Sequence, residues 1–148
     1  MLHKNSYSAI DRDMQRIEPG AHQAVRIENP LLARPIIVTA LHAPKEMTWK
    51  QAKAWAEKLD LFGWSWRLPT VEEAFFIADR SKYPATPKEF FPDIGRYEWI
   101  WTGTVDAEDP EDTDTASGSA WDVYLSYGGS GRSSQGNRSR VRAVRTGQ

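Results

Sequence analysis

Two helix-start signals of the same kind stand near the middle of this chain, with strand-like sequence on both sides of them. Thr48-Trp49-Lys50-Gln51 and Thr70-Val71-Glu72-Glu73 each place a threonine three residues before a glutamine or glutamate. This is the spacing of a capping box, in which each of the two side chains accepts a hydrogen bond from the other residue's backbone amide. Apolar residues at helical spacing follow each box. The sequence therefore predicts helices over residues 49–60 and 71–79, each with one face in a core.

Runs rich in β-forming residues surround these helices, and the last three of them have the period of two that is typical of β-strands. They lie at residues 22–27, 34–41, 97–101, 121–125 and 141–144. In the last three runs, large apolar residues alternate with a polar face that carries Glu98, Asp122, Arg140 and Arg142. This order predicts an α+β fold in which two helices pack on a twisted, mainly antiparallel sheet with long loops.

One domain is expected over residues 1–148, because a chain of this length buries a core of its own. Residues 1–20 are polar and end in a Pro-Gly turn signal. We expect them to form a loosely ordered N-terminal arm or, over residues 8–16, a short helix.

Composition excludes several classes of protein. Hydrophobic residues make up 40% of the chain and charged residues 26%, and there are seven tryptophans, so the chain is globular. The absence of cysteine excludes disulfides, thiolate zinc sites, iron–sulfur clusters and cysteine nucleophiles. No stretch resembles a signal peptide or a membrane span, so we expect a cytoplasmic protein. The net charge of −1 gives no overall attraction to nucleic acid.

Six segments carry a resemblance to a known family. They are MTWKQAKAWAEKL, WRLPTVEEAFFIAD, FFPDIG, WIWTGT, SAWDVYLSYGG and RVRAVR. Through them, residues 46–145 resemble the Lcl C-terminal domain family of bacteria and phages. That family is similar in turn to formylglycine-generating enzymes and to the variable proteins of diversity-generating retroelements. The resemblance implies a C-type-lectin-like fold and a phage or prophage setting, but this fold hosts unrelated activities, so function must be argued from residues.

No catalytic constellation stands out, and we expect a protein that is not an enzyme. The three histidines, His3, His22 and His42, are dispersed and lie outside the segments that carry the resemblance. Formylglycine-generating enzymes need a cysteine pair for copper, and their iron-dependent relatives use clustered histidines and a carboxylate. This chain offers neither pattern, so the sequence predicts no cofactor and no metal.

Residues 106–114 contain six acidic residues and no basic one. Two interpretations stand side by side for this run. A solvated loop is favoured, because the run lacks the ligand spacing and the glycine of an EF-hand. Calcium binding through a long loop of oxygen ligands is the alternative.

The segment from Tyr124 to Arg138 has the composition of a recognition surface. Tyrosine and arginine stand among serine, glycine and asparagine, as in antibody paratopes. In the retroelement relatives, the matching segment is where ligand-binding residues vary. The resemblance therefore implies partner-binding roles for Tyr124, Tyr127, Arg132, Ser134, Gln135, Asn137 and Arg138. The alternative is a plain polar hairpin connection between two strands.

These observations predict a non-catalytic binding protein that recognises a macromolecule through its C-terminal β-loop surface. A protein partner is favoured, because arginine and tyrosine dominate protein-binding hot spots. Such a protein would act as a host-factor or defence inhibitor, or as a particle component. A glycan, bound with or without calcium, is the alternative. Nucleic acid is disfavoured, since strand arginines opposite Glu98 and Asp122 are expected to be neutralised within the sheet. No membrane partner is expected.

Overall fold

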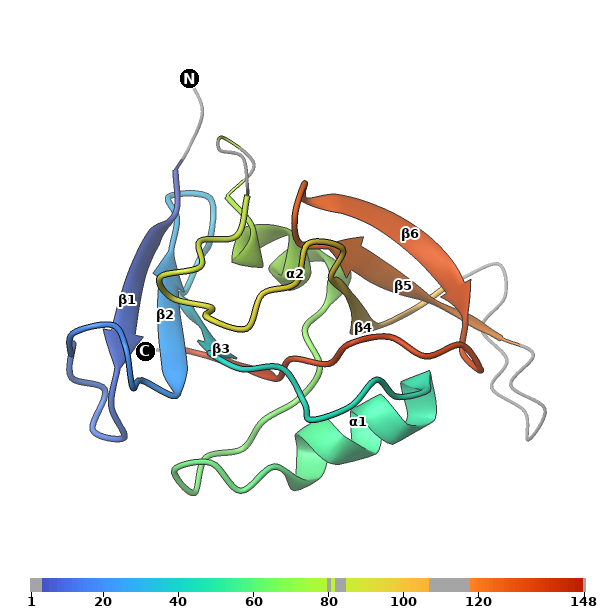
Figure 1. Cartoon of the computed structure of the whole chain (residues 1–148), viewed down its shortest axis with the longest axis horizontal. Helices are drawn as coiled ribbons and strands as arrows, with labels where there is room; N and C mark the ends of the chain where they lie inside the picture. The colour runs from blue at the N-terminus through green and yellow to red at the C-terminus, as the bar shows by residue number, and fades with distance from the viewer. Residues whose placement is uncertain (1–3, 80, 82–84, 107–117, 148) are drawn as a thin grey trace.

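The computed structural model describes residues 4–79, 81, 85–106 and 118–147 and contains two antiparallel sheets and two helices within them. Figure 1 shows the two sheets at opposite ends of the molecule, with the helices between and below them. The α+β class predicted from the sequence is confirmed. Neither helix has the length and the apolar character that crossing a bilayer would require, among the residues described.

The first sheet joins the two ends of the chain. Its strands are β1 (Ser6–Ile10), β2 (Ala24–Glu28), β3 (Ile36–Thr39) and β7 (Val144–Thr146), in the order β1-β2-β3-β7. All neighbours are antiparallel, with Val25 opposite Val38 and Val38 opposite Val144. The N-terminal and C-terminal strands therefore belong to one sheet (Figure 1).

The second sheet is a meander of three strands. It contains β4 (Trp99–Val105), β5 (Ser119–Tyr124) and β6 (Gly129–Ser134), in that order and all antiparallel. The register pairs Trp99 with Tyr124 and Trp101 with Asp122, and it shifts between Trp101 and Val105. Arg140 lies along the free edge of β4. Its backbone amide donates to the Trp99 carbonyl, and its backbone carbonyl accepts from the Trp101 amide.

Both predicted capping boxes are present, and each starts a helix at the expected residue. α1 (Trp49–Lys58) begins after Thr48 and α2 (Val71–Ile77) begins after Thr70. In each case the threonine side chain accepts from the backbone amide three residues on, and the side chain of that residue accepts from the threonine amide. Both helix predictions are confirmed, and each helix ends two residues earlier than expected.

Each helix packs one face into its own part of the core. α1 buries Trp49, Ala52 and Ala56 together with Trp101 and Val141. α2 buries Ala74 and Ile77 in a second cluster, which also contains Val25, Val38, Ile100, Val123 and Val144 from the two sheets. The second cluster therefore ties the first sheet to the second.

Three local predictions were wrong. Residues 6–10 form strand β1, not a loose arm or a helix, because Ala9 and Ile10 are buried and the Tyr7 hydroxyl donates to the Ile77 carbonyl at 2.7 Å. Residues 129–134 form strand β6, where a loop was expected, because this segment pairs along the whole length of β5. The chain ending contributes only a short strand, β7, because residues 139–143 bond to several different segments.

Candidate binding site

A groove with a cavity volume of about 620 Å³ lies on the second sheet. Its walls come from β4, β5, β6 and the segment that follows β6, so that residues far apart in the sequence meet there. The described residues that line it are Glu46, Tyr97, Trp99, Asp122, Gly131, Arg132, Ser133, Asn137, Arg138, Ser139 and Arg140. We call this the β4–β6 groove.

Trp99 and Tyr124 form an aromatic pair at the groove. They are opposite each other across β4 and β5, and their rings are stacked with centroids 4.9 Å apart and planes 10° apart. Tyr127 packs on Tyr124 at 5.1 Å between centroids and is 57% exposed. The Tyr124 hydroxyl donates to the Arg96 carbonyl at 3.2 Å, which holds the pair to the preceding loop. The position of the Trp99 ring is therefore set by the register of the sheet.

Asp122 is a buried carboxylate beside this aromatic pair. It is 4% exposed, and its Oδ2 accepts from the Ser133 hydroxyl at 2.6 Å. Its Oδ1 is buried and has no hydrogen-bond partner among the described residues. Burial raises the pKa of the Asp122 carboxyl, although the hydrogen bond from Ser133 opposes the shift.

Gly131 closes over Asp122. A Cβ at this position would lie 2.9 Å from Asp122 Oδ1 and 3.3 Å from the Trp99 ring. Any larger residue would have to displace a buried carboxylate or a tryptophan, so the absence of a side chain keeps this part of the sheet open.

The rim of the groove carries charged side chains that have no ion pair among the described residues. Arg138 and Glu46 are exposed and Arg140 is half-buried. Arg132 differs from them, because its Nη1 lies 3.3 Å from Asp106 Oδ2 and its guanidinium lies 5.6 Å from the centre of the Trp121 ring. Positive charge at the rim is therefore available mainly from Arg138 and Arg140.

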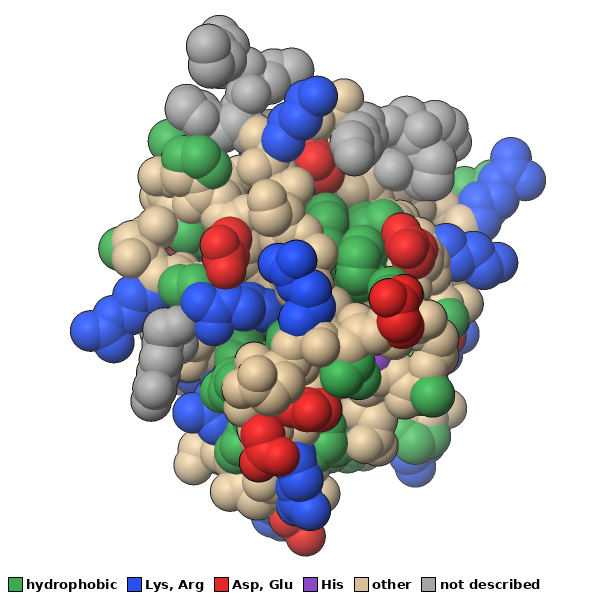
Figure 2. Space-filling view, turned by 90° about the vertical axis from the view of Figure 1, so that its left-hand side faces the viewer, with side chains coloured by type: hydrophobic (Ala, Val, Ile, Leu, Met, Phe, Trp, Pro, Cys, Tyr) green, Lys and Arg blue, Asp and Glu red, His purple; other side chains and the backbone are tan. Residues whose placement is uncertain are grey.

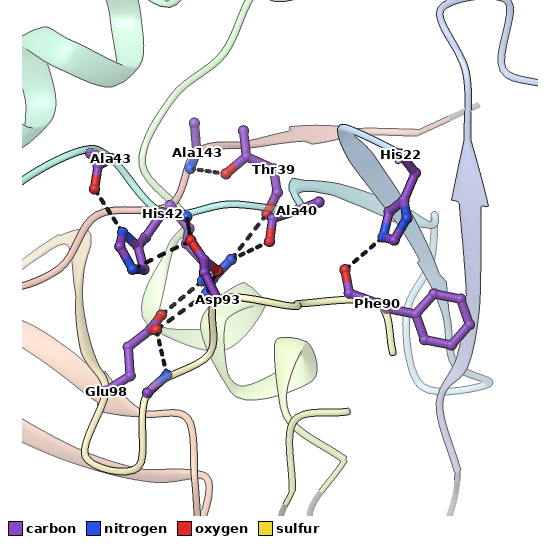
Figure 3. A network of polar contacts seen from close by, with 11 residues as sticks. His22, Thr39, Ala40, His42, Ala43, Phe90, Asp93, Glu98 and Ala143 are labelled. Atoms are coloured by element: carbon purple, nitrogen blue, oxygen red, sulfur yellow. Dashed lines mark hydrogen bonds and ion pairs between the residues drawn. The ribbon is translucent and has the colours of Figure 1, made fainter. Parts of the chain in front are cut away.

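A buried arginine positions the loop before β4 (Figure 3). Arg142 is 0% exposed, and its Nε and Nη2 donate to Glu98 Oε2 and Asp93 Oδ1, both at 2.8 Å. Its Nη1 donates to the Ala40 carbonyl at 2.7 Å, and its guanidinium lies 5.3 Å from the centre of the Phe91 ring. This network anchors both ends of residues 93–98, the segment that carries Tyr97 and leads into β4 at Trp99.

The network extends to His42. Its Nδ1 lies 2.7 Å from the Ala43 carbonyl oxygen and its Nε2 lies 3.3 Å from Asp93 Oδ2 (Figure 3).

His22 lies apart from this network and uses its Nε2 toward the Phe90 carbonyl at 2.8 Å. No group of three potential metal ligands occurs in the part of the chain that the structure describes. His3 and residues 107–114 of the acidic run lie outside that part, and so does the calcium alternative that depends on them.

The structure brings only part of the predicted contact set to the groove. Arg132, Asn137 and Arg138 line it. Tyr124 does not line it but stacks on the lining residue Trp99, and Tyr127 packs on Tyr124. Ser134 is exposed at the end of β6 and does not line the groove.

Gln135 is withdrawn from the contact set. Its side chain is 2% exposed, and the side-chain amide donates to the Ser119 carbonyl at 3.3 Å. Its backbone carbonyl accepts from the backbone amide of Trp49 at 3.0 Å. These two bonds hold the turn after β6 against the rest of the domain, and the buried side chain cannot reach a partner.

Sequence reasoning missed several residues of the groove: Glu46, Tyr97, Trp99, Asp122, Ser133 and Arg140. Asp122 was placed on one polar face with Glu98 and Arg142. The register instead puts Asp122 opposite Trp101. Glu98 and Arg142 are buried together as an ion pair, as expected for neutralised charges. The repeated tryptophans of residues 99–101 were the available signal, but their pairing partners could not be read without the register.

Comparisons with known proteins identify the family of the chain. The family model of the Lcl C-terminal domain matches residues 23–145, which adds β2 and β3 to the segment recognised from motifs. No curated protein matches the chain. Among solved structures, botrocetin aligns with a TM-score of 0.49 and 13% sequence identity, over 76% of this chain and 91% of that chain. So distant a likeness supports no conclusion about function.

Proposed function

The chain belongs to the Lcl C-terminal domain family, and from this premise we propose that it is a non-catalytic binding protein whose β4–β6 groove recognises a protein partner. The observation that carries the proposal is the combination of exposed aromatic rings and unpaired arginines in one groove. Tyr97 is 70% exposed and Trp99 36%, and both line the groove with Arg138 and Arg140. Tryptophan, tyrosine and arginine are the residue types that contribute most to protein–protein binding energy.

The rigidity of the groove supports the same proposal. Trp99 is paired in β4, Arg140 is hydrogen-bonded to β4 through both backbone groups, and residues 93–98 are anchored by Arg142. A surface that is already ordered loses little conformational entropy when a partner binds.

The non-catalytic part of the proposal rests on the kind of side chains present. Ser133 donates to Asp122, but the described lining residues of the groove include no histidine that could act as a general base for the serine. The buried acid is therefore interpreted as a structural group. The proposed setting, a phage or prophage protein that acts in the host cytoplasm, rests on the family resemblance.

A glycan is the second candidate ligand, and one observation favours it. Ser133 and Asn137, whose side chains donate and accept hydrogen bonds, line the same groove as the Trp99 ring. An aromatic ring beside such groups suits a sugar, whose apolar face stacks while its hydroxyls hydrogen-bond.

The experiment is a comparison of capture by three forms of the protein. Wild type, a groove variant (Tyr97→Ala, Arg138→Ala, Arg140→Ala) and a control variant (Arg12→Ala, Leu31→Ala, Arg34→Ala) are immobilised and exposed to host lysate and to a glycan array. The control removes the same charge and one exposed apolar side chain from exposed sites outside the groove. Thermal unfolding shows that all three forms are folded.

The proposal predicts one or a few host proteins that wild type and the control retain and the groove variant loses. Array binding that follows the same pattern, without a retained protein, would transfer the proposal to glycans. Equal retention by all three forms would refute the site.

A further inference from the structure

We infer, on the basis of the proposed function, that the β4–β6 groove binds an acidic segment of its protein partner. In this arrangement a carboxylate of the segment lies between Arg138 and Arg140, and a neighbouring apolar side chain packs on Trp99 and Tyr97. The inference names the chemistry of the partner, which the proposed function leaves open.

The charges of the groove carry the first step. Two acidic side chains are among the described residues that line the groove: Asp122 is buried beneath Gly131, and Glu46 is exposed. Of its three arginines, Arg132 is paired with Asp106, while Arg138 and Arg140 have no ion pair with any described residue. The accessible, unpaired charge is thus two positive groups against one negative, on a chain whose net charge is −1.

Arginine is well suited to this role. Its guanidinium binds a carboxylate through two parallel hydrogen bonds, which gives both energy and orientation. The backbone of this segment is held in place, because the Ser139 amide donates to the Met47 carbonyl at 3.0 Å and the Arg140 amide donates to the Trp99 carbonyl at 3.1 Å. The two arginines therefore approach an acidic partner from a fixed backbone.

The aromatic side chains carry the second step. Tyr97 and Trp99 expose apolar surface within the same groove as the arginines, and the stack on Tyr124 prevents the Trp99 ring from turning inward. Burying such rings against an apolar side chain is favourable at about 25 cal/mol per Å² of apolar area. A segment that alternates acidic and apolar residues would satisfy both parts of the groove.

Nucleic acid fits this charge pattern less well. Binding to a phosphate backbone requires a basic track along its length. Here the exposed carboxylate of Glu46 lines the same groove as the two arginines, and Arg132 is paired with Asp106. A short acidic segment requires only the local pair of arginines.

The first sheet offers a contrasting surface for a control. Figure 2 shows its side of the molecule, where acidic and basic side chains are intermixed. On β2, for example, Arg26 Nε lies 2.9 Å from Glu28 Oε1. Reversing charges outside the groove changes the net charge by the same amount without touching the proposed site.

The test is selection from a random 12-residue peptide library displayed on a carrier. Wild type, a groove variant (Arg138→Glu, Arg140→Glu) and a control variant (Arg12→Glu, Arg34→Glu) are used as separate baits. We expect wild type and the control to enrich peptides in which Asp or Glu neighbours an aromatic or branched apolar residue. A synthetic peptide of the enriched sequence should bind the groove variant at least about tenfold more weakly than it binds wild type. It should also bind the single variant Tyr97→Ala more weakly than wild type.

Several outcomes would overturn the inference. They are enrichment of neutral or basic peptides, the same peptides on all three baits, or no enrichment. Tighter binding of heparin or single-stranded DNA probes than of any peptide, lost in the groove variant, would assign the arginines to a polyanion instead. If host proteins are still captured in a groove-dependent manner, the proposed function stands and only the acidic chemistry fails. If capture does not depend on the groove, the proposed function itself fails.

Discussion

Replacement of Arg142 by alanine should destabilise the protein strongly, although this residue does not reach the surface. The side chain is fully buried and bonds two carboxylates, one of which belongs to Glu98, whose side chain is 2% exposed. The substitution leaves that carboxylate buried without its cation and leaves the Ala40 carbonyl without a donor. Breaking a buried ion pair by removing one partner costs about 3–5 kcal/mol.

Urea denaturation measures this effect. For a domain of this size we take a slope of about 2 kcal/mol per molar urea, so a loss of about 4 kcal/mol lowers the midpoint by about 2 M. Because the total stability of a domain is about 5–15 kcal/mol, the variant should remain folded without denaturant but lose between about a quarter and about four fifths of its free energy of unfolding. Binding at the groove should weaken too, since Arg142 anchors the loop that carries Tyr97.

Two further variants separate the ion pair from the loss of volume. Arg138→Ala removes an exposed arginine and should change the free energy of unfolding by less than about 0.5 kcal/mol. The double variant Arg142→Met, Glu98→Leu removes both charges and replaces them with apolar side chains, and it should recover a large part of the loss. A midpoint change below about 0.5 M for Arg142→Ala, or a double variant less stable than the single one, would refute the argument that an uncompensated buried charge causes the loss.

Three other substitutions have effects that follow from single contacts. Gly131→Ala places a Cβ 2.9 Å from Asp122 Oδ1; urea denaturation should show a loss of about 1–3 kcal/mol from overpacking, and no loss would mean that the sheet yields there. Thr48→Ala removes the cap of α1 and should cost about 0.5–2 kcal/mol, visible as reduced thermal stability with the groove still competent to bind. Burial raises the pKa of Glu73, but hydrogen bonds from Arg67 and Thr70 and the positive charge of Arg67 together outweigh it and leave the pKa below its usual value. The stability that Glu73 contributes is therefore present above about pH 4.3 and lost as pH falls through the lower folded pKa. Glu73→Gln should be less stable than wild type at pH 7, and the difference should shrink as the pH falls below about 4.3; a difference that grows on acidification would contradict this sign.

The helices and most strands were readable because their signals are local. A threonine and a glutamine or glutamate three residues later are close enough in sequence to form a capping box without any other part of the chain. The strand signals of β2, β3, β4 and β5, a run of β-forming residues or an alternation of apolar and polar ones, are likewise properties of a few consecutive residues. β1 and β6 were missed because their sequences are polar, and what makes them strands is pairing with β2 and β5.

The groove was only partly predictable for the same reason. The composition of residues 124–138 indicated a recognition surface, and Arg132, Asn137 and Arg138 do line the groove. The aromatic half of the site comes from Tyr97 and Trp99, which lie more than thirty residues earlier in the chain. Only the strand register brings the two halves together.

By itself, the sequence determined the two capped helices, the absence of cysteine chemistry and the family, because each depends on residue identity at short spacing. The tertiary structure alone decided which polar residues line the β4–β6 groove and which are buried. Asp122, Gln135, Arg140 and Arg142 are all polar residues of the same stretch, yet one arginine reaches the groove rim and the other is buried on two carboxylates. The physical reason is that burial and charge pairing depend on contacts between segments distant in sequence, and those contacts exist only once the two sheets have formed.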